Sequence, residues 1–373
     1  MQVAALSNVR HRLHPGAPLP FNVRDADKTL LLARGQMIES TEHLQALFKR
    51  GALVDMAELV STRDRVQQAR RAELPGLWRD SISRVGELLV GSAEDRFADA
   101  LDEATAPMQA LVERDPELAI FQVLRQGGSA DLAYGAQRSL QTAVTGLLVA
   151  QRLGWEASQC QRLFKVALTM NISMLELQGQ LARQNVALTT EQRSELQTHP
   201  MRSVRMLELA GVTDGDWLHA VLSHHEESDG SGYPGGHTDI SDLATLARRA
   251  DVYTAKLSAR STRDAMTADL AGRQMFMQDP GHPMTTALVR EFGIYPPGCY
   301  VRLVSGELAI VVARGPSINM PVVACLTNER GAPIARPVRR ETNSKAHAVA
   351  GVVGESHLPL RLPMDRLAAL VAA

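Results

Sequence analysis

The chain has 373 residues, 45% hydrophobic and 22% charged, which is typical of an ordinary globular protein with two or three domains. Its formal net charge is −1, so nothing favours a general binder of nucleic acid or of membrane surfaces. No stretch approaches the roughly 18 apolar residues of a membrane span, and the N-terminus lacks the apolar core of a secretion signal. The cysteines Cys160, Cys299 and Cys325 are widely spaced, so we expect a reduced, cytoplasmic setting.

Residues 1–60 are expected to form a small α+β module that contains no catalytic residue. Two short apolar runs, Leu19–Val23 and Thr29–Leu32, flank a charged segment, and this spacing predicts a β-hairpin. A helix is expected from Glu42 to Lys49, with Thr41 as its cap.

Residues 61–126 are highly charged and follow a helical period, which indicates a helical linker region. Apolar residues recur there at helical spacing and are predicted to be core residues: Leu77, Trp78, Ile82, Val85, Leu88 and Leu89. Prolines are expected to mark the starts of helices, namely Pro75, Pro107 and Pro116.

The segment Gly127-Gly128-Ser129 interrupts this pattern, and a helical domain is predicted from residue 127 to residue 292. Thr189 and Gln192 form the sequence signature of a capping box. Almost no strand pattern occurs in this part of the chain, so we expect an all-α bundle. The expected helices lie near residues 130–153, 158–171, 190–210, 215–227, 241–258 and 282–292.

Residues 293–373 change character and are predicted to form a small β appendage with a tail. Tyr300–Val304 and Glu307–Val312 alternate on either side of Ser305-Gly306, which predicts a hairpin, and Val322–Leu326 is expected to be a third strand. Residues 335–354 are polar and rich in alanine and glycine, so they are expected to be irregular. The predicted fold class is mainly α, with small flanking modules.

A chemically informative stretch extends from Leu222 to Pro234 and reads LSHHEESDGSGYP. The paired imidazoles of His224 and His225 are followed by two acids and then by a glycine-rich turn, which ends the helix and presents Tyr233. An isolated histidine pair is more often a solvated helix end. Neutral imidazole beside carboxylates nevertheless suits Zn, Fe or Mn.

The whole string HHE-x-x-DG-x-GYP resembles the signature of the HD-GYP family, bacterial metal-dependent phosphodiesterases that degrade cyclic di-GMP. This resemblance implies an HD-type helical bundle and metal ligands supplied by several helices. Four residues of this chain match expected ligands: His199 before Pro200, His224, His225 and Asp251.

Other positions depart from the family pattern. The name-giving His-Asp dyad aligns with Met170 and Asn171, and the family's lysine aligns with Met174. An earlier ligand histidine aligns with Arg138, on helix spacing alone. Met170 is a soft, weak acceptor unsuited to a phosphohydrolase metal, and Asn171 carries no charge, so the catalytic centre is expected to be disabled.

The family's substrate-contacting segment R-P-Y-R appears as Arg260-Ser261-Thr262-Arg263, with both arginines retained. Guanidinium groups bind phosphate through paired hydrogen bonds whether or not a reaction follows. The alternative is that Arg260 and Arg263 lie on a solvated helix surface.

These observations favour a degenerate HD-GYP signalling protein that binds cyclic di-GMP, or a partner such as a diguanylate cyclase, through the surface of Gly232, Tyr233 and Pro234. The alternative is an active phosphodiesterase with a reduced metal site. We expect at most one Fe, Mn or Zn ion, or none. The sequence leaves open a homodimer and the role of the N-terminal module.

Overall fold

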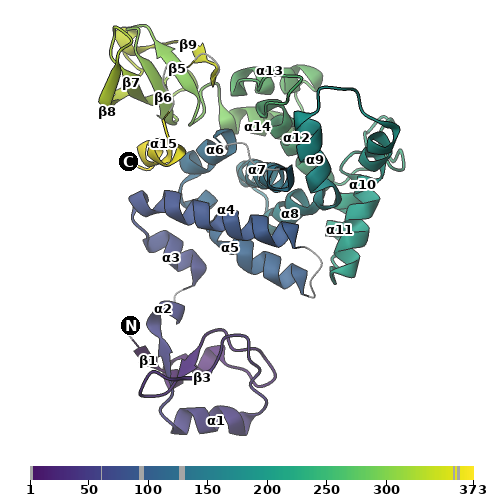
Figure 1. Cartoon of the computed structure of the whole chain (residues 1–373), viewed down its shortest axis with the longest axis vertical. Helices are drawn as coiled ribbons and strands as arrows, with labels where there is room; N and C mark the ends of the chain where they lie inside the picture. The colour runs from purple at the N-terminus through teal and green to yellow at the C-terminus, as the bar shows by residue number, and fades with distance from the viewer. Residues whose placement is uncertain (1–2, 60, 92–95, 126–130, 356–357, 359–361) are drawn as a thin grey trace. The chain divides into compact units, whose positions relative to one another are not determined.

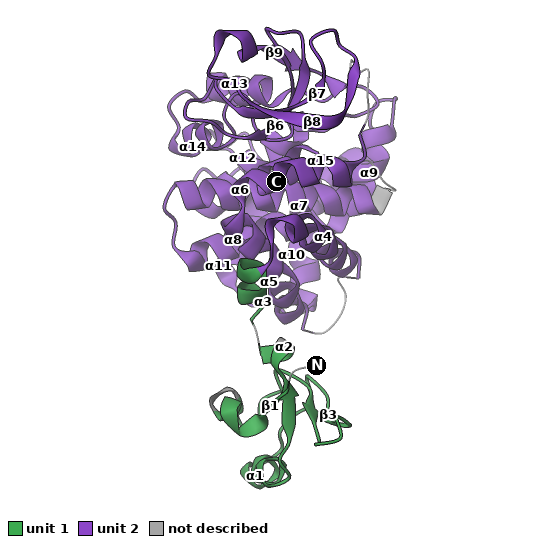
Figure 2. Cartoon of the chain, turned by 90° about the vertical axis from the view of Figure 1, so that its left-hand side faces the viewer, with its two compact units in different colours: residues 1–68 green, residues 69–373 purple. Residues whose placement is uncertain are grey.

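The computed structural model describes residues 3–59, 61–91, 96–125, 131–355, 358 and 362–373. The chain divides into two compact units, residues 1–68 and residues 69–373, which Figure 2 colours separately. Every residue that the sequence singles out as a candidate site residue belongs to the second unit.

The first unit is a small antiparallel sheet with helix α1 (Thr41–Lys49) packed into the same core. Its strands pair in the order β1-β4-β2-β3. The β2–β3 pairing confirms the predicted hairpin. The cap of α1 is Ser40 rather than Thr41, because Ser40 has extended backbone angles and its hydroxyl accepts a hydrogen bond from the His43 N–H. The remaining elements of the unit are β1 (Val3–Ala5), η1 (Leu6–Arg12), β2 (Val23–Arg24), β3 (Leu30–Leu32), β4 (Leu53–Asp55), α2 (Met56–Leu59) and α3 (Thr62–Gln68).

The second unit is a helical bundle built around helix α7 (Asp131–Arg152), which lies at its centre in Figure 1. Helices α8, α9 and α12 pack on it. Gly135 is essential for the contact with α9, because an added Cβ would lie 2.2 Å from the carbonyl oxygen of Leu175. The other helices of the bundle are α4 (Leu74–Val90), α5 (Phe97–Arg114), α6 (Pro116–Leu124), α8 (Ala157–Thr169), α9 (Leu175–Arg183), α10 (Thr190–Leu209), α11 (Gly215–Ser223), α12 (Asp242–Leu257), α13 (Ala268–Gln278) and α14 (Pro283–Phe292).

The region predicted as a helical linker contains α3, the short η2 (Arg71–Glu73) and the helices α4 to α6. Pro75 and Pro116 lie in the first turn of their helices, as predicted. Pro107 does not mark a helix start, because it lies inside α5. The apolar face of α5, with Leu101, Met108 and Leu111 buried, holds the helix together across the backbone hydrogen bond that proline cannot make.

Most helices of the predicted bundle are found with ends shifted by a few residues, and the capping box of Thr189 and Gln192 is confirmed. The helix expected over 215–227 ends earlier, at Ser223. Helices α9 and α13 were not predicted. The interruption expected at Gly127-Gly128-Ser129 lies outside the described residues.

The C-terminal part of the second unit is an antiparallel sheet with the strand order β8-β7-β6-β5-β9. The hairpin of β5 and β6 and the third strand β7 confirm the prediction. The tail was expected to be irregular. It forms two strands instead, because β8 pairs with β7 and β9 pairs with β5. The strands are β5 (Tyr300–Leu303), β6 (Leu308–Ala313), β7 (Val322–Thr327), β8 (Pro333–Glu341) and β9 (Val349–Val353), followed by α15 (Met364–Val371).

Arg314, just after β6, connects this sheet to the helical bundle. Its guanidinium donates to Glu117 of α6 at 2.6 Å and to Glu291 of α14 at 2.8 Å. These partly buried ion pairs hold the sheet against the bundle, in a molecule that is mainly α. Among the described residues, no helix combines the length and apolar character needed to span a bilayer.

Candidate functional site

His199 and His224 are delivered to one point by two different helices. His199 lies inside α10, directly before Pro200, and His224 follows the last residue of α11. Both side chains are almost completely buried, at 0% and 1% exposure. Their Nε2 atoms lie 3.1 Å apart.

The hydrogen bonds of these two rings fix their tautomers. Nδ1 of His199 lies 2.7 Å from the carbonyl oxygen of Leu196, and Nδ1 of His224 lies 2.7 Å from that of Val221. A carbonyl oxygen can only accept, so each Nδ1 carries a proton and each Nε2 presents a lone pair. Two lone pairs therefore face each other at hydrogen-bond distance, and a positive charge is needed between them.

Burial keeps these imidazoles neutral. Desolvation lowers the pKa of His199 to about 4 and that of His225 to about 3, and it places the pKa of His224 well below its ordinary value. Neutral imidazole is the form that binds metal ions.

His225 completes the cluster, with one ligand atom of each ring lying within 4.8 Å of the others. Its surroundings differ from those of its neighbours. Arg248 of α12 donates to Nδ1 of His225 at 3.3 Å and also pairs with Glu227. Metal binding through this Nδ1 would have to displace the guanidinium.

Tyr233 is half buried, not exposed on a turn outside the core as the sequence suggested. Its ring stacks on His225, with centroids 4.5 Å apart and planes 15° from parallel. Burial raises the pKa of its hydroxyl to about 12. The predicted contact surface of Gly232, Tyr233 and Pro234 is thus the outer side of the histidine cluster.

Glu226 holds the loop that carries Tyr233. Its buried carboxylate accepts hydrogen bonds from the backbone N–H of Gly235 at 2.7 Å and of His237 at 3.0 Å. Gly232 is required because an added Cβ would lie 2.4 Å from the Cα of Glu226. The sequence reading did not assign these roles to Glu226 or Arg248, although Glu226 stands inside the recognised string and Arg248 lies one helical turn before Asp251.

Asp251 of α12 is not among the groups of the histidine cluster. Its Oδ1 accepts a hydrogen bond from Nη2 of Arg138 at 2.9 Å, and Nη2 also donates to the Asp251 carbonyl at 3.2 Å. Thr142 lies 3.3 Å from the same Oδ1. A metal-ligand role for Asp251 stays a prediction, and it would require this ion pair to open.

Arg138, on α7, is 5% exposed. Burial lowers the pKa of its guanidinium, the charge of Asp251 acts in the opposite direction, and the charges of Arg260 and Arg263 lower it further. Arg138 is therefore a buried cation that pairs with Asp251 and feels the charges of two further arginines.

Met170 and Asn171 follow α8, and Met174 ends the short helix η3 (Ile172–Met174). All three are buried, at 0%, 2% and 7% exposure. Oδ1 of Asn171 is buried and has no hydrogen-bond partner among the described residues. These two positions thus offer one neutral amide oxygen where the family that the chain resembles has a histidine and an aspartate.

Arg260 and Arg263 lie in the exposed loop after α12, where their backbone groups bond to each other at 2.8 and 3.0 Å. The guanidinium of Arg263 donates to the carbonyl of Ala255 at 2.7 Å. Their phosphate-binding role stays a prediction. A separate cavity of about 770 Å³ borders the motif and is lined in part by His224, Glu227 and Arg248.

The cluster fits a single divalent metal ion. The facing Nε2 lone pairs of His199 and His224, with the ring of His225 close by, are neutral donors that suit a transition metal. Bound there, an ion would supply Lewis-acid polarisation of a phosphate oxygen.

Residues 129–278 match the family model described as HD domain. The cyclic di-GMP phosphodiesterase PA4108 of Pseudomonas aeruginosa is 28% identical over 257 residues, covering 67% of this chain and 60% of that protein. The cyclic di-GMP phosphodiesterase PdeB of Borreliella burgdorferi is 26% identical over 33% of this chain and 32% of its own length.

The cyclic di-GMP phosphodiesterase response regulator RpfG of Xanthomonas campestris pv. campestris is 28% identical over 35% of each chain. A solved structure, Bd1817, an HDG"Y"P protein from Bdellovibrio bacteriovorus, aligns with a TM-score of 0.48 and 16% identity, over 77% of this chain and 97% of that one. The chain thus spans 60% of the length of the Pseudomonas aeruginosa protein and about a third of the length of the other two curated relatives.

Residues 129–278 therefore form an HD domain. With its HHE-x-x-DG-x-GYP string the chain is similar to the HD-GYP family, and Met170 and Asn171 align with the positions of that family's dyad.

Proposed function

We propose that this protein is a signalling member of its family that binds cyclic di-GMP, or a partner protein such as a diguanylate cyclase, without hydrolysing the nucleotide. The observation that carries the proposal is the buried ion pair of Arg138 and Asp251. It occupies Asp251, a carboxylate whose charge acts on His199 and His224, and it places a fixed positive charge on that carboxylate.

Electrostatics makes a centre with several metal ions unfavourable here. Two dications roughly 4 Å apart repel by about 16 kcal/mol at an effective dielectric near 20, so anionic ligands must offset that repulsion. Asn171 contributes no charge, and the charge of Asp251 is already neutralised by Arg138. We therefore expect at most one Fe, Mn or Zn ion, held by His199, His224 and His225.

The retained arginines support binding without turnover. Arg260 and Arg263 are exposed, and each carries a guanidinium that can pair with a phosphate oxygen. The cavity beside the motif has the volume of a small-molecule site. Nothing in these features requires a reaction to follow binding.

The test is calorimetry with cyclic di-GMP on the wild type and on the double variant Arg260→Ala, Arg263→Ala, with nucleotide hydrolysis followed chromatographically on the same samples. We expect wild-type binding, at least tenfold weaker binding by the double variant, and no turnover. Arg330→Ala with Arg336→Ala removes two exposed arginines from the C-terminal sheet region and serves as the matched control. Absence of wild-type binding at high micromolar nucleotide would exclude the nucleotide version.

The partner version is tested with Tyr233→Ala. The half-buried ring packs on His225, so its removal should cost roughly 1 kcal/mol of stability while weakening a diguanylate cyclase complex much more. A large drop in melting temperature would mean that Tyr233 acts mainly as packed structure. An unchanged complex would remove Tyr233 from the contact surface.

One observation favours the alternative function, an active phosphodiesterase with a reduced metal site. The facing Nε2 atoms of His199 and His224 are arranged to hold an ion without Asp251. Turnover of cyclic di-GMP by protein supplied with Mn, Fe or Zn, abolished in His224→Ala, would establish this alternative.

A further inference from the structure

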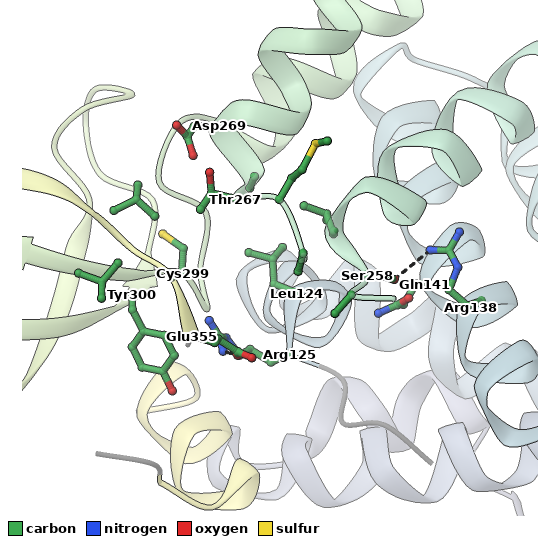
Figure 3. Close-up of a pocket in the computed structure, with 18 of the residues that line it drawn as sticks. Leu124, Arg125, Arg138, Gln141, Ser258, Thr267, Asp269, Cys299, Tyr300 and Glu355 are labelled. Atoms are coloured by element: carbon green, nitrogen blue, oxygen red, sulfur yellow. Dashed lines mark hydrogen bonds and ion pairs between the residues drawn. The ribbon is translucent and has the colours of Figure 1, made fainter. Parts of the chain in front are cut away.

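Figure 3 shows a cavity of about 370 Å³ in the second unit, with Arg125 and Arg138 on its wall. Both guanidinium groups are already paired. Arg125 pairs with Glu355 and donates to the carbonyl of Gly298 at 2.5 Å, and Arg138 pairs with Asp251. An anion that entered this cavity would have to compete with a carboxylate for either arginine.

Another cavity of the same unit, with a volume of about 350 Å³, is lined by the last residue of α7, the end of α14 and the loop between β6 and β7. Three arginines lie on its wall, Arg152, Arg290 and Arg314, and none of its described lining residues is acidic. The volume is within the range of small-molecule sites. None of the clustered histidines lines this cavity.

Two carboxylates next to this wall neutralise part of its charge. Both oxygens of the buried Glu291 are used, because Arg152 pairs with Oε2 and Nη1 of Arg314 donates to Oε1 at 2.8 Å. Glu117 accepts a hydrogen bond from Nε of Arg314 at 2.6 Å. Three guanidinium groups thus share two carboxylates, which leaves one positive charge in excess.

Several N–H groups of these arginines remain available to a ligand. Arg290 is exposed and makes no hydrogen bond or ion pair with the described residues. The side chain of Arg152 is 37% exposed and bonds to described residues only through Nε. Nη2 of Arg314 has no described partner and is not among the buried unpartnered atoms, so solvent reaches it. A solute in the cavity can therefore contact all three guanidinium groups.

The wall also carries accessible apolar surface. Ile294 and Ile318 are 37% and 68% exposed, and Tyr295 is half buried. The loop that carries Ile318 closes tightly on itself, because a Cβ added to Gly315 would lie 1.7 Å from the carbonyl oxygen of Met320. The cavity thus combines a cluster of cations with apolar side chains.

We propose that this cavity binds a small phosphate monoester, with its phosphate on the three arginines and an apolar or aromatic body against Ile294, Tyr295 and Ile318. Guanidinium pairs with phosphate oxygens through two parallel hydrogen bonds. A phosphate monoester carries close to two negative charges at neutral pH, so it uses several guanidinium groups better than a carboxylate does. The inference does not rest on the cyclic di-GMP binding proposed above.

The test is calorimetry with phenyl phosphate, which joins a phosphate to an aromatic ring, and with two probes that each lack one of these parts. Inorganic phosphate lacks the ring, and benzoate has a carboxylate in place of the phosphate. We expect phenyl phosphate to bind at least threefold more tightly than either and to raise the melting temperature. Its affinity should fall with added salt and below about pH 6, where the phosphate loses its second charge and the arginines keep theirs.

Arg290→Gln removes one guanidinium without breaking an ion pair of the described residues. It should weaken phenyl phosphate binding about tenfold, because a charge-assisted hydrogen bond is lost, and leave the melting temperature of the free protein unchanged. Arg273→Gln, at an exposed position on α13 outside the cavity, is the matched control and should bind as the wild type does.

Ile318→Ala tests the apolar part of the wall. It should weaken phenyl phosphate binding about threefold and leave the binding of inorganic phosphate unchanged. Val304→Ala removes a side chain that is 61% exposed and lies outside the cavity, and it should change neither affinity.

No binding of phenyl phosphate at millimolar concentration, or equal binding by Arg290→Gln and the wild type, would overturn the inference. Tighter binding of benzoate would contradict the choice of phosphate, and equal binding of inorganic phosphate would contradict the apolar contact. Cyclic di-GMP titrated into Arg290→Gln keeps the two proposals apart. We expect normal nucleotide binding there, whereas loss of both ligands would contradict a separate site.

Discussion

Arg138 occupies a position where the resemblance predicted a metal ligand, and it pairs with the carboxylate that was predicted to be another. A guanidinium is permanently charged, and it cannot be displaced by a change of pH in the physiological range. The chain thus carries a permanent cation on Asp251, a carboxylate whose charge acts on His199 and His224. Removing that cation should change what the site binds.

Arg138→Gln should leave Asp251 as a half-buried, uncompensated carboxylate and destabilise the metal-free protein by roughly 3–5 kcal/mol. The same carboxylate would then be free to join His199 and His224. We therefore expect the variant to bind Mn or Zn more tightly than the wild type, and to recover stability when metal is added. Elemental analysis and thermal unfolding with and without metal measure both effects.

The double variant Arg138→Gln, Asp251→Asn is the control, because it removes both charges and should show no gain in metal affinity. Arg260→Ala removes a nearby arginine outside the pair. Equal metal content in the wild type and in Arg138→Gln would show that the ion pair does not withhold Asp251.

The buried imidazoles predict a pH dependence of the metal-free protein. In the unfolded chain a histidine titrates near pH 6.5, whereas the pKa of folded His199 is about 4. The unfolded state therefore binds more protons between these values, so stability is complete above pH 6.5 and falls as the pH falls toward 4. The expected slope is roughly 1.4 kcal/mol per pH unit for each such histidine.

Denaturant unfolding of chelator-treated protein between pH 7.5 and 4.5 measures this slope. His199→Gln should make it shallower, whereas His14→Gln removes an exposed imidazole and is the control. A slope that does not change in His199→Gln would mean that this ring is not held neutral by burial.

At the scale of elements, the loop after α11 depends on backbone contacts that only glycine permits. Gly232→Ala would bring a Cβ to within 2.4 Å of backbone atoms of Glu226 and Glu227, which cannot move independently of the histidines. We expect a lower melting temperature and loss of the Tyr233–His225 stack, and hence weaker partner binding. Ser231→Ala, one residue earlier and exposed, should have little effect on the melting temperature. Similar melting temperatures for the two variants would show that the loop can rearrange around the added methyl group.

The predictability of the elements follows the strength of their local patterns. Helix α10 is long and begins with a capping box, and its boundaries were predicted to within a residue. Helix α9 is short and begins directly after η3, so its apolar residues gave no separate signal. Strands β8 and β9 are the two edges of their sheet, where exposed arginine and alanine are tolerated because one side has no neighbour.

Site residues were predictable only where they belong to a sequence motif of the family that the chain resembles. His224 and His225 belong to the recognised string, and His199 lies before a proline in the expected order. The contact of Arg138 with Asp251 joins residues 113 positions apart and has no local signature.

At the scale of the second unit, Arg314 ties the C-terminal sheet to the bundle by contacting α6 and α14 together. Arg314→Gln should destabilise the protein by roughly 2 kcal/mol or more, because Glu291 is buried and would lose one of its charged partners. Hydrogen exchange should increase in β5, β6 and β7 before it increases in α7. Arg302→Gln, in the same sheet and exposed, is the control, and uniform exchange in both variants would show that Arg314 does not couple the two parts.

The two carbonyl groups that hold His199 and His224 lie one helical turn before their rings, on the same helices. The direction of each lone pair is therefore set when α10 and α11 fold, before any ligand arrives. The conformational entropy of both side chains has already been lost at that stage, so an arriving ion meets a rigid pair of donors and little reorganisation opposes its capture. Discrimination between ions at this site should then follow from bond length and preferred angle, because the donors cannot adapt to a poorly matched ion.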